Sequence, residues 1–421
     1  MALAPDRLYA SPNALASHYS VFRVHERLLL TGHSHQAWPD VGFDGQRQAW
    51  LDAAEHVDDK WDIAAEKASE VTVGYRRLLG GCDGDLTLDT NTHALVVRFL
   101  SALPLTERPR LVTTDGEFHS IRRQLDRLAE EGIEVVKAAA EPLNSLSERV
   151  AAEVDDRTAA VLISSVLFGT GCIVPELPAV AETCASHGAE LLIDAYHSLN
   201  VVPFSLQGME RAFVVAGGYK YCQLGEGNCV LRVPPRCELR PVITGWFSEF
   251  AELADAKVPR DVGYGLGAAR FAGSTYDPTS HYRAAEVFAF FEQEQLAPEL
   301  LREVSQHQVG LLLETFESLD LDPAVVCLDE SVLLHERGGF LALRAPGAEK
   351  LSASLKQHGV RTDFRGDVLR FGPAPYLSDA QLVAAMAAGW VRSWATRCRL
   401  LPRCSRSSSC QISSGTDSAG G

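Results

Sequence analysis

The sequence predicts an α/β protein with a large domain, built on a mainly parallel sheet between helices, and a smaller α+β domain. Its 421 residues are enough for both. The middle of the chain alternates short apolar runs with helical stretches, which is typical of a parallel sheet covered on both faces. The pattern changes near Gly273, where a long helical stretch (281–319) precedes two short apolar runs and one more helix.

The strands of the large domain are expected in six apolar runs. Helices are expected between them at 120–132, 146–154 and 177–188. Ligands of such sheets bind beyond the C-terminal ends of the strands, so the residues that follow each run are the candidates for a site. The six runs are 110–114, 133–139, 158–166, 189–197, 212–218 and 228–235.

The domain boundaries follow from the change of pattern. We expect an N-terminal segment, 1–49, that contributes to the small domain and the site, a large domain at 50–268 and a small domain at 269–395. The last stretch, 396–421, is rich in Ser, Gly and Arg and has little to bury, so we expect it to be disordered and without a catalytic role.

Composition excludes several classes of function. The net charge of -16 argues against a nucleic-acid binder, which needs a basic surface. No apolar run approaches the roughly 18 to 20 residues that span a bilayer, and no signal peptide is evident. The ten cysteines are scattered without a C-x-x-C pair, which favours a reducing cytoplasm. The histidines have no metal-binding spacing, so no metal is expected.

Lys220 is the first candidate for chemistry. It stands between the apolar run "AFVVAGG" and a glycine-containing turn, and a buried lysine is costly unless its charge is paired or its amine is used. Asp194 ends the apolar part of the preceding run, "AELLID". A single Asp after a strand most often caps a turn. An acid after one strand and a lysine after the next is what pyridoxal 5'-phosphate (PLP) requires, because the lysine binds the aldehyde and the carboxylate pairs with the ring nitrogen.

Two further stretches suit a phosphate and a flat ring. Thr90, Asn91 and Thr92 precede an amphipathic helix, where free N–H groups and short polar side chains bind anions. The alternative is an ordinary N-cap, which uses the same residue types. Phe118 follows the run at 110–114 and is placed to stack on a planar ring, with a core phenylalanine as the alternative.

The stretches "LLIDAYHSLNVVPF" and "GGYKYCQLGEGN" resemble the core of the class V, fold-type I PLP enzymes, and most closely kynureninase. The resemblance runs from "LLLTGHSHQAWPD" to "DVLRFGPAPYLSD". It implies a mainly parallel seven-stranded sheet, PLP as the cofactor, a small amino-acid substrate and a homodimer with shared active sites.

The resemblance also implies roles. Lys220 would bind PLP and move the substrate's α-proton, Asp194 would pair with the ring nitrogen, and Tyr219 would reach the phosphate and donate a proton. Arg370 would hold the substrate's α-carboxylate through a two-pronged contact. The other cofactor-binding residues would be Asn91, Thr92, Phe118, Ser120, His197, Trp246, Ser274 and Thr275, and the other substrate-binding residues Ser34 and His56.

Some positions depart from the family pattern. "TGHSHQ" places His33, Ser34 and His35 where the family has Gly-Asn-Ser, and Ser274–Thr275 resembles the Gly-Thr phosphate contact of general class V aminotransferases. Ile121 stands where an acidic residue is usual. These departures affect the prediction of the substrate more than the prediction of the cofactor.

The implied reaction is cleavage of the Cβ–Cγ bond of L-kynurenine, 3-hydroxykynurenine or a related amino acid to an anthranilate and L-alanine, a step of tryptophan catabolism. A class V aminotransferase or another PLP-dependent lyase acting on a different amino acid is the alternative. A cysteine desulfurase would need a mobile cysteine, and only Cys222 is close to Lys220. A cofactor-free binding module is disfavoured because Lys220, Asp194 and Arg370 occur together.

Overall fold

The computed structural model describes residues 4–81, 83–253 and 262–388, and these belong to one compact unit. The predicted disordered stretch at 396–421 lies outside the described residues. No described helix is both long and apolar enough to cross a membrane. The predicted domain boundaries at residues 49, 268 and 395 stay predictions.

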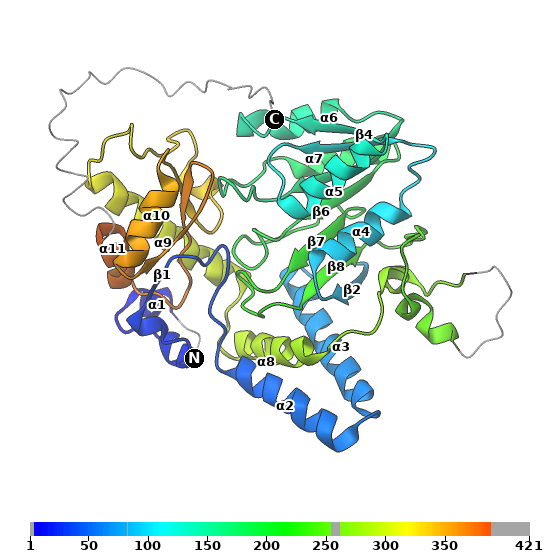
Figure 1. The fold of residues 1–421 in the computed structure, drawn as a ribbon, viewed down its shortest axis with the longest axis horizontal. Coiled ribbons are helices and arrows are strands. Elements are labelled where there is room, and N and C mark those ends of the chain that lie inside the picture. The colour runs from blue at the N-terminus through cyan, green and yellow to red at the C-terminus, as the bar shows by residue number, and fades with distance from the viewer. Residues whose placement is uncertain (1–3, 82, 254–261, 389–421) are drawn as a thin grey trace, which may run out of the picture. The chain divides into compact units, whose positions relative to one another are not determined.

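A seven-stranded sheet forms the centre of the fold (Figure 1). Only β8 runs against the other six strands, because its pairings with β2 and β7 are antiparallel and the remaining pairs are parallel. The predicted mainly parallel sheet between helices is therefore confirmed. In spatial order the strands are β2 (Asp85–Asp89), β8 (Cys229–Val233), β7 (Phe213–Gly217), β6 (Glu190–Asp194), β5 (Thr158–Ser164), β3 (Arg110–Thr114) and β4 (Glu134–Ala138).

The six predicted runs contain six of these strands, and β2 was missed. The three strands β5, β7 and β8 are buried at every residue, which explains their unbroken apolar sequences. The sequence of β2, "DLTLD", alternates polar and apolar residues at the edge of the sheet, and its two leucines are only half-buried. A short edge strand of this kind carries little apolar signal.

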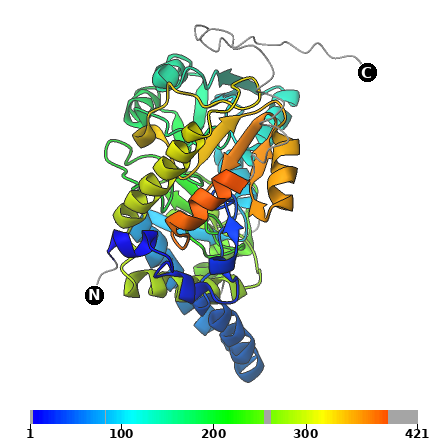
Figure 2. The same ribbon diagram turned by 90° about the vertical axis from the view of Figure 1, so that its left-hand side faces the viewer.

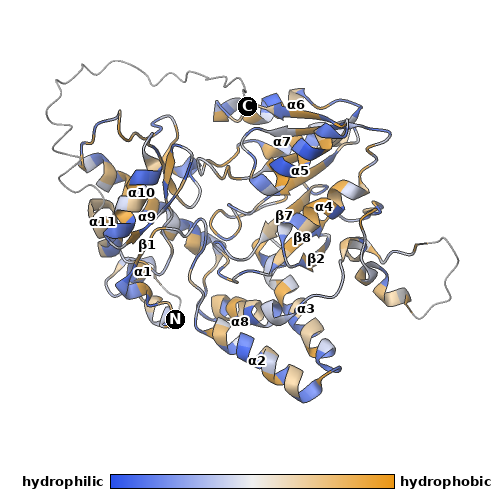
Figure 3. Ribbon diagram, in the orientation of Figure 1, coloured by the Kyte–Doolittle hydropathy of each residue, from blue (hydrophilic) through white to orange (hydrophobic). Residues whose placement is uncertain are grey.

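Helices cover the sheet. Leu95 and Phe99 of α4 and Ile121 and Leu125 of α5 are fully buried in the same apolar core as Phe213 of β7. Hydrophilic and hydrophobic residues are interspersed along α5, as its mixed colours show in Figure 3, and most of its exposed residues are polar. The helices that pack on the sheet are α4 (Thr92–Ala102), α5 (His119–Glu130), α6 (Leu146–Ala152) and α7 (Leu177–Ser186).

The helices α2 (Val41–His56), α3 (Lys60–Leu78) and α8 (Thr279–Gln293) pack together. The close approach of these three helices depends on glycines, which have no side chain. A Cβ on Gly45 would lie 2.6 Å from the carbonyl oxygen of Tyr282, and a Cβ on Gly74 would lie 2.4 Å from the ring of Phe288. The predicted helical stretch at 281–319 is two helices, since Pro298 begins α9 (Pro298–Ser318) and proline cannot continue a preceding helix.

A small antiparallel sheet is formed by β11 (Asp363–Arg365), β12 (Val368–Phe371) and β9 (Leu341–Arg344). Figure 2 shows the N-terminal segment beside it. The remaining elements of this region are α1 (Pro5–Tyr9), β1 (Leu28–Leu29), α10 (Ala348–Gln357), β10 (Val360–Arg361) and α11 (Asp379–Ala388).

The N-terminal segment is joined to the small region by backbone hydrogen bonds. β1 pairs in parallel with β10, and the Gly372 N–H donates to the Leu30 carbonyl at 2.7 Å. The Gly32 N–H donates to the Gly372 carbonyl at 2.8 Å. A Cβ on Gly32 would lie 2.3 Å from the carbonyl oxygen of Pro373, so only glycine allows the two backbones to lie this close. This contact fixes the residues that follow, His33 to Gln36.

Gly74→Ala should lower the thermal unfolding midpoint, because the added methyl group overlaps the Phe288 ring between α3 and α8. Overpacking of this kind costs about 1–3 kcal/mol. The matched control is Gly347→Ala, whose added Cβ meets no atom within 4 Å. Calorimetry on the two variants would contradict the proposed packing constraint if both melted at the same temperature.

Candidate active site

Lys220 lies just beyond the C-terminal end of β7 and is 6% exposed. Its Nζ lies 2.5 Å from Nε2 of His197. Three aromatic rings surround the amine, with centroids at 5.0 Å for Tyr196, 5.5 Å for Phe118 and 6.0 Å for Tyr219. A Cβ on Gly217 would lie 1.9 Å from the hydroxyl of Tyr196, so glycine at the end of β7 is required for this ring to approach.

The protonated, positively charged form of the Lys220 amine is disfavoured in this position. Burial lowers the pKa of its amine, the positive charge of Arg370 lowers it further, and the carboxylate of Asp194 opposes both effects only in part. A lysine whose pKa is lowered holds more of the neutral, nucleophilic amine at neutral pH. The position of Lys220 thus suits an amine that bonds to a carbonyl carbon.

Asp194 ends β6, the strand next to β7, and is 5% exposed. One of its carboxylate oxygens accepts a hydrogen bond from the backbone N–H of Tyr196 at 2.8 Å. Burial raises the pKa of Asp194, against the effects of this hydrogen bond and of Lys220. The sequence predicted an acid and a lysine after neighbouring strands, and the structure places the two side chains close enough to influence each other's pKa.

His197 is buried, and its pKa lies well below the ordinary value because of burial and the nearby charge of Lys220. Its Nδ1 atom has no hydrogen-bond partner in the described part of the chain. A buried ring nitrogen without a partner is costly, which is typical of a site completed by a ligand.

Glu117 is a buried acid that sequence reasoning missed. It is 2% exposed, and its carboxyl group lies 2.7 Å from the hydroxyl of Thr114, 3.1 Å from the Ser164 N–H and 2.5 Å from the Ser164 hydroxyl. Burial raises its pKa to about 7. It links the ends of β3 and β5 directly before Phe118. An acid inside a turn that follows a buried strand was the sequence feature that could have revealed it.

Phe118 and the first residues of α4 are the positions predicted to contact a flat ring and a phosphate. Phe118 is half-buried, and its ring makes an edge contact with that of Phe168 at 5.3 Å, so it lies at the border of the core near Lys220, and its role stays a prediction. Asn91 caps α4, with its Oδ1 accepting the Ala94 N–H at 2.9 Å, as the alternative interpretation proposed. Thr92 is buried, and its hydroxyl lies 3.5 Å from Sγ of Cys229 in β8, the neighbour of β7.

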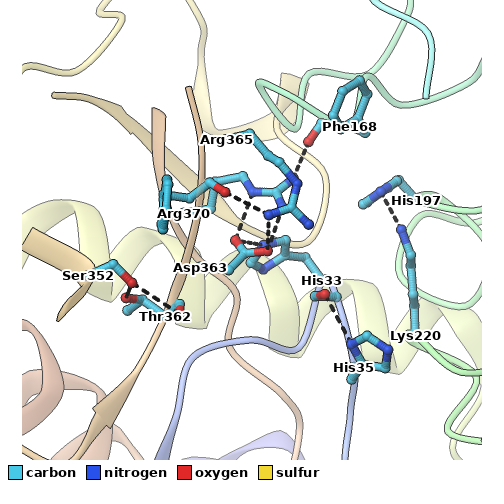
Figure 4. Close-up of polar contacts among 12 residues, drawn as sticks. His33, His35, Phe168, His197, Lys220, Ser352, Thr362, Asp363, Arg365 and Arg370 are labelled. Atoms are coloured by element: carbon cyan, nitrogen blue, oxygen red, sulfur yellow. Dashed lines mark hydrogen bonds and ion pairs between the residues drawn. The ribbon is translucent and has the colours of Figure 1, made fainter. Parts of the chain in front are cut away.

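Arg370 is 2% exposed and forms a double ion pair with Asp363, at 2.9 Å from Nε and 2.5 Å from Nη2 (Figure 4). Its Nη1 donates to the carbonyl of Phe168 at 2.6 Å. Asp363 also accepts a hydrogen bond from Nε2 of His33 at 2.8 Å. Sequence reasoning did not identify Asp363 or assign a role to His33, although an acid seven residues before the arginine in "DFRGDVLR" is visible in the sequence.

The other predicted residues lie outside this cluster. Ser34 bonds with Nδ1 of His35 at 3.1 Å, near the stacked pair of His35 and Tyr219, whose centroids are 4.9 Å apart. Ser120 is half-buried in the first turn of α5. The exposed members of the predicted set are Trp246, Ser274, Thr275 and His56, the last residue of α2. Their roles stay predictions.

Comparison with known proteins bears on this cluster. The chain matches the family model of the aminotransferase class-V proteins over residues 89–242 and that of the kynureninase C-terminal domain over residues 301–388. The chain is similar in sequence to the kynureninases. It is 25% identical to the kynureninase of Bacillus cereus over 81% of this chain and 78% of that protein. The kynureninase of Deinococcus radiodurans is 24% identical over 79% of this chain and 81% of its own length.

Solved structures agree on the fold. C-DES, determined with glycine covalently linked to the PLP cofactor, superimposes with a TM-score of 0.77 at 14% identity, over 89% of this chain and 98% of that one. A cysteine desulfurase from Thermococcus onnurineus superimposes with a TM-score of 0.75 at 15% identity, over 92% of this chain and 98% of the other. At such identities the likeness shows the PLP-dependent fold and nothing finer.

PLP is the cofactor that these relationships indicate, and the residues around Lys220 fit it. The buried amine, a buried carboxylate on the next strand and aromatic rings within 6.0 Å suit a flat cofactor that carries an aldehyde and a basic ring nitrogen. The bare Nδ1 of His197 leaves a polar group for it to meet.

The carboxyl group of Glu117 should make folding stability depend on pH. Its pKa is about 7 in the folded protein, against an ordinary 4.5, so between these values the folded state binds more protons than the unfolded state. Stability therefore falls as pH rises through this window, by about 3 kcal/mol in all. Glu117→Gln, which imitates the protonated acid, removes this loss.

The measurement is urea unfolding of wild type and Glu117→Gln at pH 4.5 and pH 8. The free energy of unfolding of wild type, relative to the variant, should be lower at pH 8. Glu107→Gln, at an exposed acid, is the control and should show no such trend. A relative stability independent of pH would show that Glu117 ionises normally.

Proposed function

We propose that this protein is a PLP-dependent, kynureninase-like hydrolase that cleaves the Cβ–Cγ bond of L-kynurenine, 3-hydroxykynurenine or a related amino acid. The products are an anthranilate and L-alanine. The observation that carries the proposal is the buried Lys220 amine beside Asp194 and His197, with the guanidinium group of Arg370 near enough to lower the lysine's pKa. The similarity to kynureninases over about four-fifths of the chain supports the substrate class.

When bound, PLP supplies an aldehyde carbon that captures amines and a ring that accepts electrons from bonds next to the captured nitrogen. Asp194 would hold a proton on the ring nitrogen, and Phe118 would lie against the ring. Lys220, with its lowered pKa, would take the proton from the substrate's Cα. Arg370 would hold the α-carboxylate and so orient the bond to be broken.

Tyr219 is suited to donate a proton. Burial raises its pKa, so it keeps its proton at neutral pH, and its ring is stacked on His35 at an interplanar angle of 19°. It neighbours Lys220 in the chain, and its ring centroid lies 6.0 Å from the lysine's Nζ. Lys220 and Tyr219 would therefore share the proton transfers on the two sides of the cleaved bond.

The alternative is a class V aminotransferase or another PLP-dependent lyase acting on a different amino acid, which would use Lys220, Asp194 and Arg370 in the same way. A desulfurase is disfavoured because Cys222 is 1% exposed and burial raises the pKa of its thiol far above neutral pH. All six cysteines in the described residues are free thiols, which supports a cytoplasmic location.

The decisive reaction test incubates the PLP-reconstituted protein with L-kynurenine and with 3-hydroxy-L-kynurenine. Mass spectrometry should find L-alanine together with the matching anthranilate. Lys220→Ala should abolish this turnover and the absorbance of covalently bound PLP, while Lys356→Ala, at an exposed lysine of α10, retains both. Formation of a keto acid without alanine would favour an aminotransferase, and turnover retained in Lys220→Ala would refute the proposal.

We also propose a homodimer that shares its active sites. Large apolar side chains are exposed in two places, on α2, where Trp50 is 79% exposed, and in the described stretches 242–253 and 262–266, where Leu266 is 85% exposed. Exposed apolar side chains gathered in this way favour association. The second place contains Trp246, which the family resemblance assigns to the site across a dimer interface.

Trp50→Glu should weaken the dimer, because it places a charge on the exposed apolar side of α2. Light scattering after size-exclusion chromatography should give twice the chain mass for wild type and a shift toward the single-chain mass for the variant. Val383→Glu adds the same charge on α11 at a residue that is 41% exposed, and it should leave the mass unchanged. A monomeric wild type would refute the dimer.

A further inference from the structure

The ion pair between Arg370 and Asp363 occupies only part of the guanidinium group. Nε and Nη2 donate to the two carboxylate oxygens, and Nη1 donates to the Phe168 carbonyl. An arginine has five N–H donors, so one N–H on each of Nη1 and Nη2 is left. A second carboxylate can bind these two donors at the end of the guanidinium group.

The geometry of the small sheet determines which edge of the Arg370 guanidinium group binds Asp363. Asp363 and Arg370 are directly opposed residues of the antiparallel pair β11–β12. The turn between these strands contains Gly366 at φ +55, a conformation that favours glycine. The register therefore holds the acid against the Nε–Nη2 edge of the arginine, and one N–H on each of Nη1 and Nη2 has no partner among the described residues.

His33 completes the arrangement from the N-terminal segment. Its ring is fully buried, 4.5 Å from the ring of Phe340, and burial lowers its pKa to about 4. The ring is therefore neutral at neutral pH and donates from Nε2 to Asp363. A Cβ on Gly372 would lie 2.2 Å from the ring's Nδ1, so the glycine that pairs with the N-terminal segment also makes room for the ring.

The cluster faces the lysine. Figure 4 shows Arg370, Asp363 and His33 together, with His197 and Lys220 on the side where the guanidinium group ends. Arg370, Asp363 and His33 each influence the pKa of Lys220 or His197, which places them within electrostatic reach. Phe340 packs against His33, His197 and Arg370, at 4.5, 5.9 and 5.6 Å.

We propose that Asp363 and His33 are positioning residues, which hold the Nε–Nη2 edge of Arg370 so that its free end presents two donors to the α-carboxylate of the substrate. The proposal rests on the proposed function only in taking the ligand to be an α-amino acid. In this chain a neutral imidazole, that of His33, therefore supports the acid that orients the arginine.

The test compares two ligands that differ only in the carboxylate. L-Alanine and ethylamine both carry the amine, and neither has a Cβ–Cγ bond to cleave. Their dissociation constants for the PLP-loaded protein are obtained from the absorbance change of the bound cofactor and, independently, by calorimetry. Wild type should bind alanine at least tenfold more tightly than ethylamine, because only alanine reaches the free end of Arg370.

Asp363→Asn should weaken alanine binding at least tenfold and change ethylamine binding less than twofold, since the carboxamide cannot hold the guanidinium group by two charged contacts. Asp367→Asn is the matched control, the same change at an exposed acid of the same turn, and it should alter neither constant. Should Asp363→Asn fail to fold, His33→Leu removes the donor to Asp363 and should show the same selective loss, and His33→Asn, which keeps an N–H donor, should restore most of the affinity.

Equal losses for the two ligands, or no loss for either, would overturn the positioning role. A wild type without preference for alanine would overturn the carboxylate site itself. These outcomes can be told apart from a failure of the proposed reaction. A protein that leaves kynurenine uncleaved, and still prefers alanine in a way that depends on Asp363, would refute the proposed reaction. It would leave the positioning role of Asp363 intact.

Discussion

The burial of one lysine amine is the constraint on which the rest of the site depends. Nζ of Lys220 lies beyond the end of β7, in a place 6% exposed, where a full positive charge is costly. The sheet order limits this cost, because β6 is the neighbour of β7 and ends in Asp194. The aromatic residues and His197 exclude water without supplying a second full negative charge. The amine is therefore held between its charged and neutral forms, which suits an amine that must bond to a carbonyl carbon and also carry protons.

A second constraint joins segments that are far apart in the chain. His33 and Asp363 are 330 positions apart, and their contact requires the N-terminal segment to lie against the end of β12. Two glycines allow this, since side chains at Gly32 and Gly372 would overlap Pro373 and His33 respectively. The N-terminal segment thus packs against the small sheet and also contributes His33 to the site.

Sequence analysis predicted those parts of the molecule in which the local pattern of apolar residues matches the burial of the element that they form. Buried strands such as β5 and β7 are continuous apolar runs, and the residues that follow β6 and β7 carry the acid and the lysine. The edge strand β2 was missed because only half of its surface is buried. The break between α8 and α9 was missed because an apolar periodicity continues past Pro298, although the proline itself marks the boundary.

The residues that prediction missed are those whose role depends on strand register. Nothing local distinguishes Asp363 from the exposed Asp367 four residues later, and only the pairing of β11 with β12 sets the first of them opposite Arg370. Glu117 likewise gains its role from Ser164 on another strand. Phe118 and Lys220 were singled out because each follows a strong apolar run, whereas Glu117 and Asp363 were not singled out because their contacts come from other strands.

Asp363 has a second consequence for the lysine. An arginine without a partner near Lys220 would repel the protonated amine and drive its pKa lower, while the carboxylate of Asp363 acts in the opposite direction. The pair thus brings a guanidinium group close to the reacting amine while adding little net charge. When a carboxylate occupies the free end of Arg370, the local charge becomes more negative, and this favours the protonated form of Lys220. Under the proposed function, binding of the substrate's carboxylate would then raise the lysine's affinity for the proton of Cα, and this would link recognition of the substrate to the first proton transfer.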